Sequence, residues 1–206
     1  NKEYLPVVIK EEEGLSVCGF VRRDIVHSNL RIPHISVNIV PVIRGTENII
    51  IHKRSFKRKI DPLKHDFNGG HVTYEPILFY DSKTLELIND KTALRETREE
   101  IAVSNDGRPY VFSSNDLIRF TKVGELLTGF DEKDSINVGY MTGYIVFIPS
   151  DSTIIITDEN EDGLIEELSY KEISMPELVS LFKNNPDDFA GGAKAILNEL
   201  SNPKSE

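Results

Sequence analysis

The sequence predicts an α+β sandwich in which helices cover both faces of a mixed β-sheet. Apolar and polar residues alternate in several short segments, one central segment has helical spacing, and two helical segments close the chain. Strands and helices do not alternate strictly, as they would in a parallel α/β protein. The chain has 206 residues, 39% of them hydrophobic, so we expect a single domain over residues 1–206 with a polar tail at about 201–206.

Six strands are expected from β-branched, aromatic or alternating segments. They are Tyr4–Ile9, Leu15–Val21, Ile35–Val42, Asn48–His52, Ile136–Ile148 and Ile154–Thr157. The first two form a hairpin around the acidic turn Glu11–Gly14, and the next two pair with each other. The segment Asp61–Gly70 contains Pro62, Gly69 and Gly70, which predicts irregular structure there.

Three helices are expected. Asn89 or Asp90 caps the central helix, which runs to about Ile101 and is followed by the stop signal N-D-G at positions 105–107. The two closing helices are predicted at Glu177–Lys183 and Asp187–Leu200.

Composition narrows the classes of function. A formal net charge of −10 argues against nucleic acid or an anionic membrane as partner, because such binding requires a clustered basic face. The single cysteine, Cys18, excludes an internal disulfide and a zinc site built from cysteines, so a reducing cytoplasm is expected. No apolar run approaches the roughly 20 residues of a membrane span, and no signal-peptide core is present at the N-terminus.

The most informative segment reads R-E-T-R-E-E-I at positions 95–101. On a helix, Glu96, Glu99 and Glu100 lie on one side, where their like charges repel. A divalent cation, Mg²⁺ or Mn²⁺, removes that repulsion and prefers oxygen ligands. The alternative is a solvated charged face on which Arg95 pairs with Glu99.

Together, G-G-H-V at 69–72 and T-A-L-R-E-T-R-E-E-I-A-V at 92–103 resemble the Nudix box, G-x5-E-x7-R-E-U-x-E-E-x-G-U with U aliphatic. The resemblance implies a Nudix-type α/β/α sandwich and a hydrolase of phosphoric anhydrides. It implies that the Gly70 carbonyl, Glu96, Glu99 and Glu100 hold the metals, and that Arg95 orients Glu96 through a salt bridge.

The box departs from the family pattern in length. Gly70 and Arg95 have 24 residues between them instead of 13, which implies an insertion of 11 residues around Glu75–Leu85. A loop absorbs this length cheaply, since doubling it costs about 0.6 kcal/mol. The first glutamate of the box falls on Leu87, beside Glu86, and is left unassigned.

The remaining departures are two substitutions and an apolar insertion. Ala102 replaces the late glycine, and Thr97 replaces an aliphatic residue. The inserted segment includes Phe79 and Tyr80, so we expect it to form a wall of the substrate pocket, a homodimer contact or a locally packed loop.

His27, His34 and His71 resemble the metal-binding histidines of isopentenyl diphosphate isomerase, which has the Nudix fold. That enzyme requires a catalytic cysteine where this chain has Gly69. His27 and His34 are therefore equally well explained as ordinary structural histidines. His71 follows the predicted metal-binding carbonyl and is a candidate substrate-binding residue.

The basic stretch Lys53–Lys59 is unusual in an acidic chain. A solvated loop and a nucleic-acid patch are alternatives, but beside a phosphate-cleaving site Lys53 and Arg54 are candidates to hold the distal phosphate.

The predicted function is metal-dependent cleavage of a diphosphate in a small nucleoside diphosphate-linked substrate. The general base is Glu96 or one of the late carboxylates. These are Asp158, Glu159, Glu161, Glu166 and Glu167. The competing classes are an isopentenyl diphosphate isomerase, disfavoured by the missing cysteine, and a binding or regulatory domain without turnover, disfavoured by the intact carboxylates.

Overall fold

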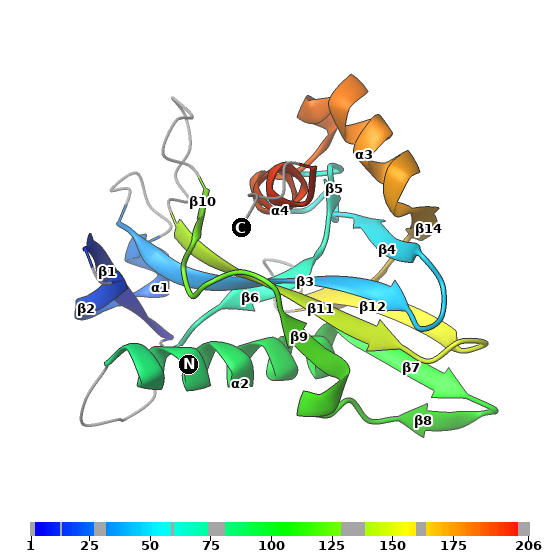
Figure 1. Ribbon diagram of the computed structural model, residues 1–206, viewed down its shortest axis with the longest axis horizontal. Helices are drawn as coiled ribbons and strands as arrows, with labels where there is room; N and C mark the ends of the chain where they lie inside the picture. The colour runs from blue at the N-terminus through cyan, green and yellow to red at the C-terminus, as the bar shows by residue number, and fades with distance from the viewer. Residues whose placement is uncertain are drawn as a thin grey trace.

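A mixed β-sheet separates one long helix from two shorter helices (Figure 1). The computed structural model describes residues 3–12, 14–26, 32–58, 60–73, 81–128, 139–159 and 164–201. Within these ranges no helix has the length and apolar character needed to cross a membrane.

The described helices are α1 (Arg23–Val26), α2 (Ser82–Glu100), α3 (Met175–Asn184) and α4 (Gly191–Ser201), with 3₁₀ turns η1 (Ser114–Asp116) and η2 (Pro186–Asp188). The strands of the first half are β1 (Tyr4–Glu11), β2 (Gly14–Arg22), β3 (His34–Ile43), β4 (Asn48–Lys53), β5 (His65–Asp66) and β6 (Asn68–His71). The later strands are β7 (Ile101–Asn105), β8 (Arg108–Tyr110), β9 (Leu117–Arg119), β10 (Leu126–Thr128), β11 (Gly139–Ile148), β12 (Thr153–Glu159), β13 (Ile165–Leu168) and β14 (Tyr170–Ser174).

The larger sheet is mixed, as predicted. Its central strands β3 and β11 run parallel over ten residue pairs, from His34 with Gly139 to Ile43 with Ile148. Antiparallel neighbours extend it on both sides, in the order β10-β11-β3-β1-β2, with β6 also paired to β3 and β4 joining β14, β3 and β5. A second, four-stranded sheet has the order β13-β12-β7-β8.

Strand alternation gives the larger sheet two apolar faces. In β3, Ile35, Val37 and Ile39 belong to the core that packs against α2, whereas Val40 belongs to the core beneath α3 and α4. This period of two is the expected consequence of a pleated strand buried on both sides. The predicted α+β sandwich is therefore confirmed.

The central helix starts earlier than the sequence predicted. Asp81 is its N-cap and accepts a hydrogen bond from the Thr84 amide at 2.8 Å. Asn89 lies inside the helix, fully buried, and bonds to Leu85 of the preceding turn and to Thr142 of β11. The prediction of an N-cap at Asn89 or Asp90 was wrong. The polar side chain of Asn89 serves a buried contact with a strand of the sheet and does not cap the helix.

This longer helix changes the interpretation of the insertion at Glu75–Leu85. The last four residues of the predicted insertion, Ser82–Leu85, form the first turn of α2, and Leu85 is buried in the core. Residues 74–80, including Phe79 and Tyr80, lie outside the described residues, as does His27.

Three other boundaries also differ. The N-D-G signal at 105–107 forms the turn of the β7–β8 hairpin, with positive φ at Asp106 and Gly107, because residues from Ile101 onward pair with β12. The predicted loop Asp61–Gly70 contains β5 and most of β6. The last helix begins at Gly191 rather than Asp187, after the turn η2.

Candidate active site

The last turn of α2 faces strand β6, and the spacing of residues along the helix matches the spacing of residues along the strand. Glu96 and Glu100 are four residues apart on the helix, a rise of about 6 Å. Residues 68 and 70 are two apart on the strand, about 6.6 Å, and share the face that is turned towards α2. The structure accordingly brings Glu96 to Gly70 and Glu100 to Asn68 and Gly69.

Gly70 leaves room for the Glu96 carboxylate, which occupies the place of a side chain at this position. A Cβ on Gly70 would lie 2.3 Å from both Cδ and Oε1 of Glu96. Glu96 itself is 8% exposed. Burial raises the pKa of Glu96, and Arg95 counteracts part of that increase.

Gly69 is constrained by the neighbouring strand. Its φ is +156°, and a Cβ there would lie 2.3 Å from the carbonyl oxygen of Val37. A cysteine at this position, which an isopentenyl diphosphate isomerase requires, would clash with β3. The backbone N–H of Gly69 instead donates to Glu100 Oε2 at 3.0 Å.

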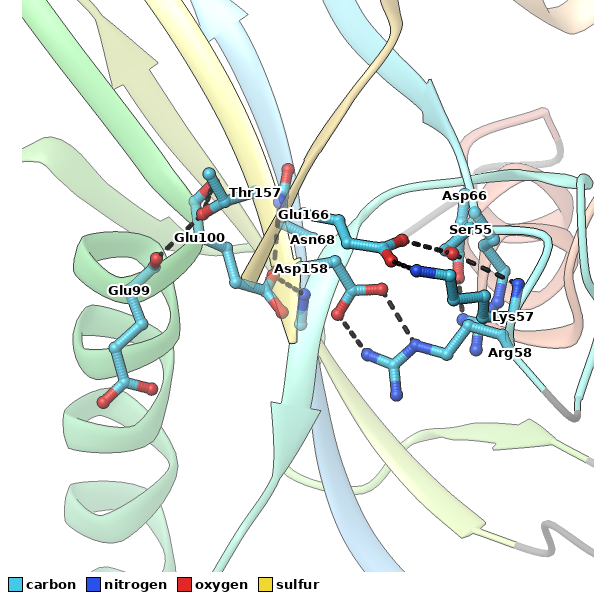
Figure 2. A network of polar contacts seen from close by, with 12 residues as sticks. Ser55, Lys57, Arg58, Asp66, Asn68, Glu99, Glu100, Thr157, Asp158 and Glu166 are labelled. Carbon is cyan, nitrogen blue, oxygen red and sulfur yellow. Dashed lines mark hydrogen bonds and ion pairs between the residues drawn. The ribbon is translucent and has the colours of Figure 1, made fainter. Parts of the chain in front are cut away.

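Glu100 is partly exposed as a residue, but its carboxylate lies deep among β6, β12 and α2 (Figure 2). Asn68 Nδ2 donates to the same Oε2 at 3.2 Å. Burial, then the negative charges of Glu96 and Asp158, raise the pKa of Glu100 well above its ordinary value despite these two hydrogen bonds.

Arg95 bridges two of the three glutamates. Its guanidinium lies 2.6 Å from Glu96 Oε1 and 3.0 Å from Glu99 Oε2, and it reaches the His71 carbonyl at 3.4 Å. Glu99 is the most open of the three glutamates, with 57% of its side chain exposed. Both sequence interpretations of Arg95 thus have a structural counterpart, since it contacts Glu96 and also pairs with Glu99.

The basic segment is tied down by the hairpin of β12 and β13. Arg58 Nε donates to Asp158 Oδ2 at 2.9 Å and Nη2 bonds the other oxygen, while Lys57 and Ser55 both bond Glu166 (Figure 2). Arg58 therefore lies near Glu100, separated from it by the carboxylate with which it pairs. Arg58 was not singled out individually from the sequence.

The residues predicted to hold a distal phosphate lie further along this segment. Arg54 is only 24% exposed and pairs with Asp66 at 2.5 Å, whereas Lys53 is exposed and pairs in register with His65. His71 stacks against buried His34, with ring centroids 4.8 Å apart.

The late carboxylates separate into near and distant ones. Asp158 lies close enough to affect Glu100, and Glu166 lies next to it in register, while Glu167 is exposed beside Thr157. Glu161 and the side chain of Glu159 lie outside the described residues.

The first box glutamate has no counterpart at this site. Glu86 pairs with Arg119 at 3.2 Å and Leu87 is exposed. Glu86 precedes Glu96 by ten residues, about 15 Å along the helix, so it is too distant to join the carboxylate group.

The donor set fits a hard divalent cation. Glu96 and Glu100 present two enclosed carboxylates, and the first occupies the space that a Cβ of residue 70 would take. In the part of the chain that the structure describes, no three His, Cys, Asp or Glu side chains already converge on a metal position. Completing the site therefore requires further oxygens, from the Gly70 carbonyl, from Glu99 after it leaves Arg95, or from substrate.

The fold of this chain is similar to that of solved structures. Across 96% of this chain and 98% of the other, it is similar to the protein DR0079 from Deinococcus radiodurans, with a TM-score of 0.54 and 17% identity. A NUDIX hydrolase from Alicyclobacillus acidocaldarius has a TM-score of 0.49 and 13% identity over 81% of this chain and 90% of that one. A MutT protein from Methanosarcina mazei Go1 has a TM-score of 0.49 and 12% identity over 84% and 96%.

No protein-family model matches the sequence, and no curated protein matches it significantly. At these identities the structural similarity defines the fold alone, so the activity is argued from the site itself.

Proposed function

We propose that this protein is a divalent metal-dependent hydrolase that cleaves a phosphoric anhydride in a nucleoside diphosphate-linked substrate. The observation that carries the proposal is the pair Glu96 and Glu100, whose enclosed carboxylates face the double glycine of β6. Carboxylates held together without enough cations destabilise the protein, and a bound Mg²⁺ or Mn²⁺ offsets that cost.

In this proposal Glu96, Glu99, Glu100 and the Gly70 carbonyl hold the metal. A divalent cation held there would supply electrostatic stabilisation for the charge on phosphate oxygens and would favour the deprotonation of water. Arg95 holds Glu96 in position through its 2.6 Å ion pair, and Glu96 or Asp158 accepts the proton of the attacking water. Asp158 is a candidate because it lies across from Glu100 (Figure 2).

Substrate contacts are proposed on the basic segment and on β6. Lys53 is exposed, so its ammonium group can approach a distal phosphate, and His71 follows Gly70 in the chain. Arg54 serves this role only if a phosphate replaces Asp66 as its partner, because the two form a close ion pair.

The test is a hydrolysis screen of nucleoside triphosphates, nucleotide sugars and other diphosphate-linked nucleotides with Mg²⁺ or Mn²⁺. We expect turnover of at least one class, abolished by excess EDTA and restored by metal. Turnover that persists in EDTA contradicts the metal mechanism, and binding without turnover of any member favours a binding domain. No isomerisation of isopentenyl diphosphate is expected, because Gly69 has no thiol and no room for one.

A further inference from the structure

Asn68 is the one side chain of β6 that contacts Glu100. It is 2% exposed, and its Nδ2 donates to Glu100 Oε2 at 3.2 Å. The Gly69 amide donates to the same oxygen. Among the described contacts, both donors therefore bond to Oε2 of Glu100. Oε1 of Glu100 remains for another partner.

The Asn68 amide presents its nitrogen to Glu100. This is the orientation that an ionised carboxylate requires, because such a group only accepts hydrogen bonds. The amide oxygen, Oδ1, is bonded to the same carbon as this nitrogen. This Oδ1 is buried and has no hydrogen-bond partner. A buried acceptor without a donor is rare in native proteins and calls for an explanation.

Two carboxylates lie near the Asn68 amide. Glu100 accepts its N–H, and Asp158, which pairs with Arg58, lies close enough to Glu100 to raise its pKa (Figure 2). Another carboxylate cannot donate to an amide oxygen while ionised. A divalent cation, or a water molecule bound to one, would satisfy the amide oxygen and offset the negative charge of the carboxylates at the same time.

We propose that Asn68 is a positioning residue of the metal site, which holds Glu100 by its N–H and presents Oδ1 as a further oxygen donor to the divalent cation or its water shell. This inference rests on the proposed metal-dependent hydrolysis and extends it to a residue outside the carboxylate helix.

Asn38 provides a matched control on the neighbouring strand. It is also a buried asparagine, 6% exposed, whose Oδ1 has no partner. It faces the opposite side of the sheet, because a Cβ on Gly192 of α4 would lie 2.8 Å from its Nδ2. Replacing Asn38 therefore disturbs a comparable buried amide without touching Glu100.

The experiment compares Asn68→Leu, Asn68→Asp and Asn38→Leu with the wild-type protein. The Mn²⁺ dissociation constant is measured by the electron paramagnetic resonance signal of free Mn²⁺, and unfolding is measured in the metal-free protein. Leucine matches asparagine in shape but has neither a donor nor an oxygen, whereas aspartate keeps an oxygen and loses the N–H donor.

For Asn68→Leu we expect the Mn²⁺ dissociation constant to rise about tenfold or more, as for other residues that orient metal ligands. The kcat on a substrate found in the screen should fall by a similar factor, with little change in KM, because Asn68 touches Glu100 and not the substrate. Asn68→Asp should bind Mn²⁺ at least tenfold more tightly than Asn68→Leu, and Asn38→Leu should keep the wild-type affinity.

An unchanged Mn²⁺ affinity in Asn68→Leu, with only a lower unfolding temperature, would show that Asn68 is merely structural. Equal affinities for Asn68→Asp and Asn68→Leu would overturn the role of its oxygen. Either result leaves the proposed hydrolysis intact if the wild-type protein still turns over substrate with metal. A wild-type protein that neither binds Mn²⁺ nor hydrolyses any substrate refutes the proposed function itself.

Discussion

Two groups of charged side chains meet at β12, and they are balanced very differently (Figure 2). The carboxylate group of α2 has three glutamates, Glu96, Glu99 and Glu100, and Arg95 is the cation that contacts two of them. The neighbouring paired group has three acidic and three basic side chains. Its ion pairs are Arg54 with Asp66, Lys57 with Glu166, and Arg58 with Asp158.

The difference distinguishes a group whose charges are paired within the protein from one that, in our proposal, binds a divalent cation. Counted as formal charges of the side chains in contact, three glutamates and Arg95 give the carboxylate group −2, whereas three acidic and three basic side chains give the paired group 0. In the paired group the acidic and basic side chains neutralise one another, and their ion pairs hold the 54–58 segment against the β12–β13 hairpin. The carboxylate group has an excess charge that a divalent cation would match.

The largest effect is expected from Glu100→Gln, which removes one charge from the carboxylate group. The kcat should fall by at least two orders of magnitude, since a ligand charge of the metal is lost. Unfolding of the metal-free protein should occur at the same or a higher temperature, because burial and like charges disfavour ionised Glu100. Steady-state kinetics and thermal unfolding measure the two quantities.

Glu172→Gln is the control for this experiment, because Glu172 is an exposed glutamate of β14. It should leave kcat unchanged. Wild-type kinetics in Glu100→Gln at equal stability would mean that the two groups do not differ in function and that the glutamates are only a solvated face.

Arg58→Met should produce the next largest effect, by unbalancing the paired group. It leaves Asp158, with 12% of its side chain exposed, without its cation and close to Glu100. Breaking a largely buried pair in this way should lower the unfolding free energy by about 2–3 kcal/mol. Urea denaturation of the metal-free protein measures the loss, and added Mn²⁺ should recover part of it.

The double variant Arg58→Met with Asp158→Leu tests whether charge imbalance is the cause. Removing both charges should restore most of the stability, since replacing a buried pair with apolar residues is often neutral. If the double variant is less stable than Arg58→Met, the pair contributes through packing rather than through balance.

The smallest effect is a pH dependence centred on His52, a buried neighbour of the paired group. Burial lowers the pKa of His52 below its ordinary value of 6.5. As the pH falls, His52 therefore takes up a proton in the unfolded chain before it does so in the folded protein. This difference lowers the free energy of unfolding between about pH 6.5 and the pKa of His52 in the folded protein. The wild-type protein should lose up to about 1.4 kcal/mol per pH unit more than His52→Gln in this window.

The carboxylate group gives the opposite dependence of stability on pH in the metal-free protein. The pKa values of Glu96 and Glu100 are raised in the fold, so their contribution is present at low pH and is lost as the pH rises through those values. Comparing urea denaturation of the wild type and His52→Gln cancels this shared term. Parallel pH profiles for the two proteins would contradict the assignment to His52.

Much of the sheet was predictable because its central strands have strong local signals. The hairpin of β1 and β2, the strands β3, β4, β11 and β12, and the mixed α+β class all follow from apolar runs and alternation. The short strands β5 to β10, β13 and β14 were not predicted. Each has only two to five residues, so pairing with distant segments and not local propensity defines it.

The carboxylate face of α2 was predictable from the sequence, because i, i+3 and i+4 spacing on any helix places Glu96, Glu99 and Glu100 on one side. The double glycine was likewise identifiable beside it. Asn68 was not identifiable, because an asparagine before two glycines is equally typical of a turn. Its contact with Glu100 exists only once β6 pairs with β3 and lies under the end of α2.

The sequence by itself thus determined the chemical character of the protein: an acidic chain with clustered helical carboxylates next to a glycine pair. The tertiary structure decided which charges are already neutralised. Arg58 and Asp158 are 100 positions apart in the chain, and Glu166 lies 109 positions from Lys57, so no local pattern relates them. Coulomb interactions depend on distance in space and on burial, and both are set only when the sheet and its helices are assembled.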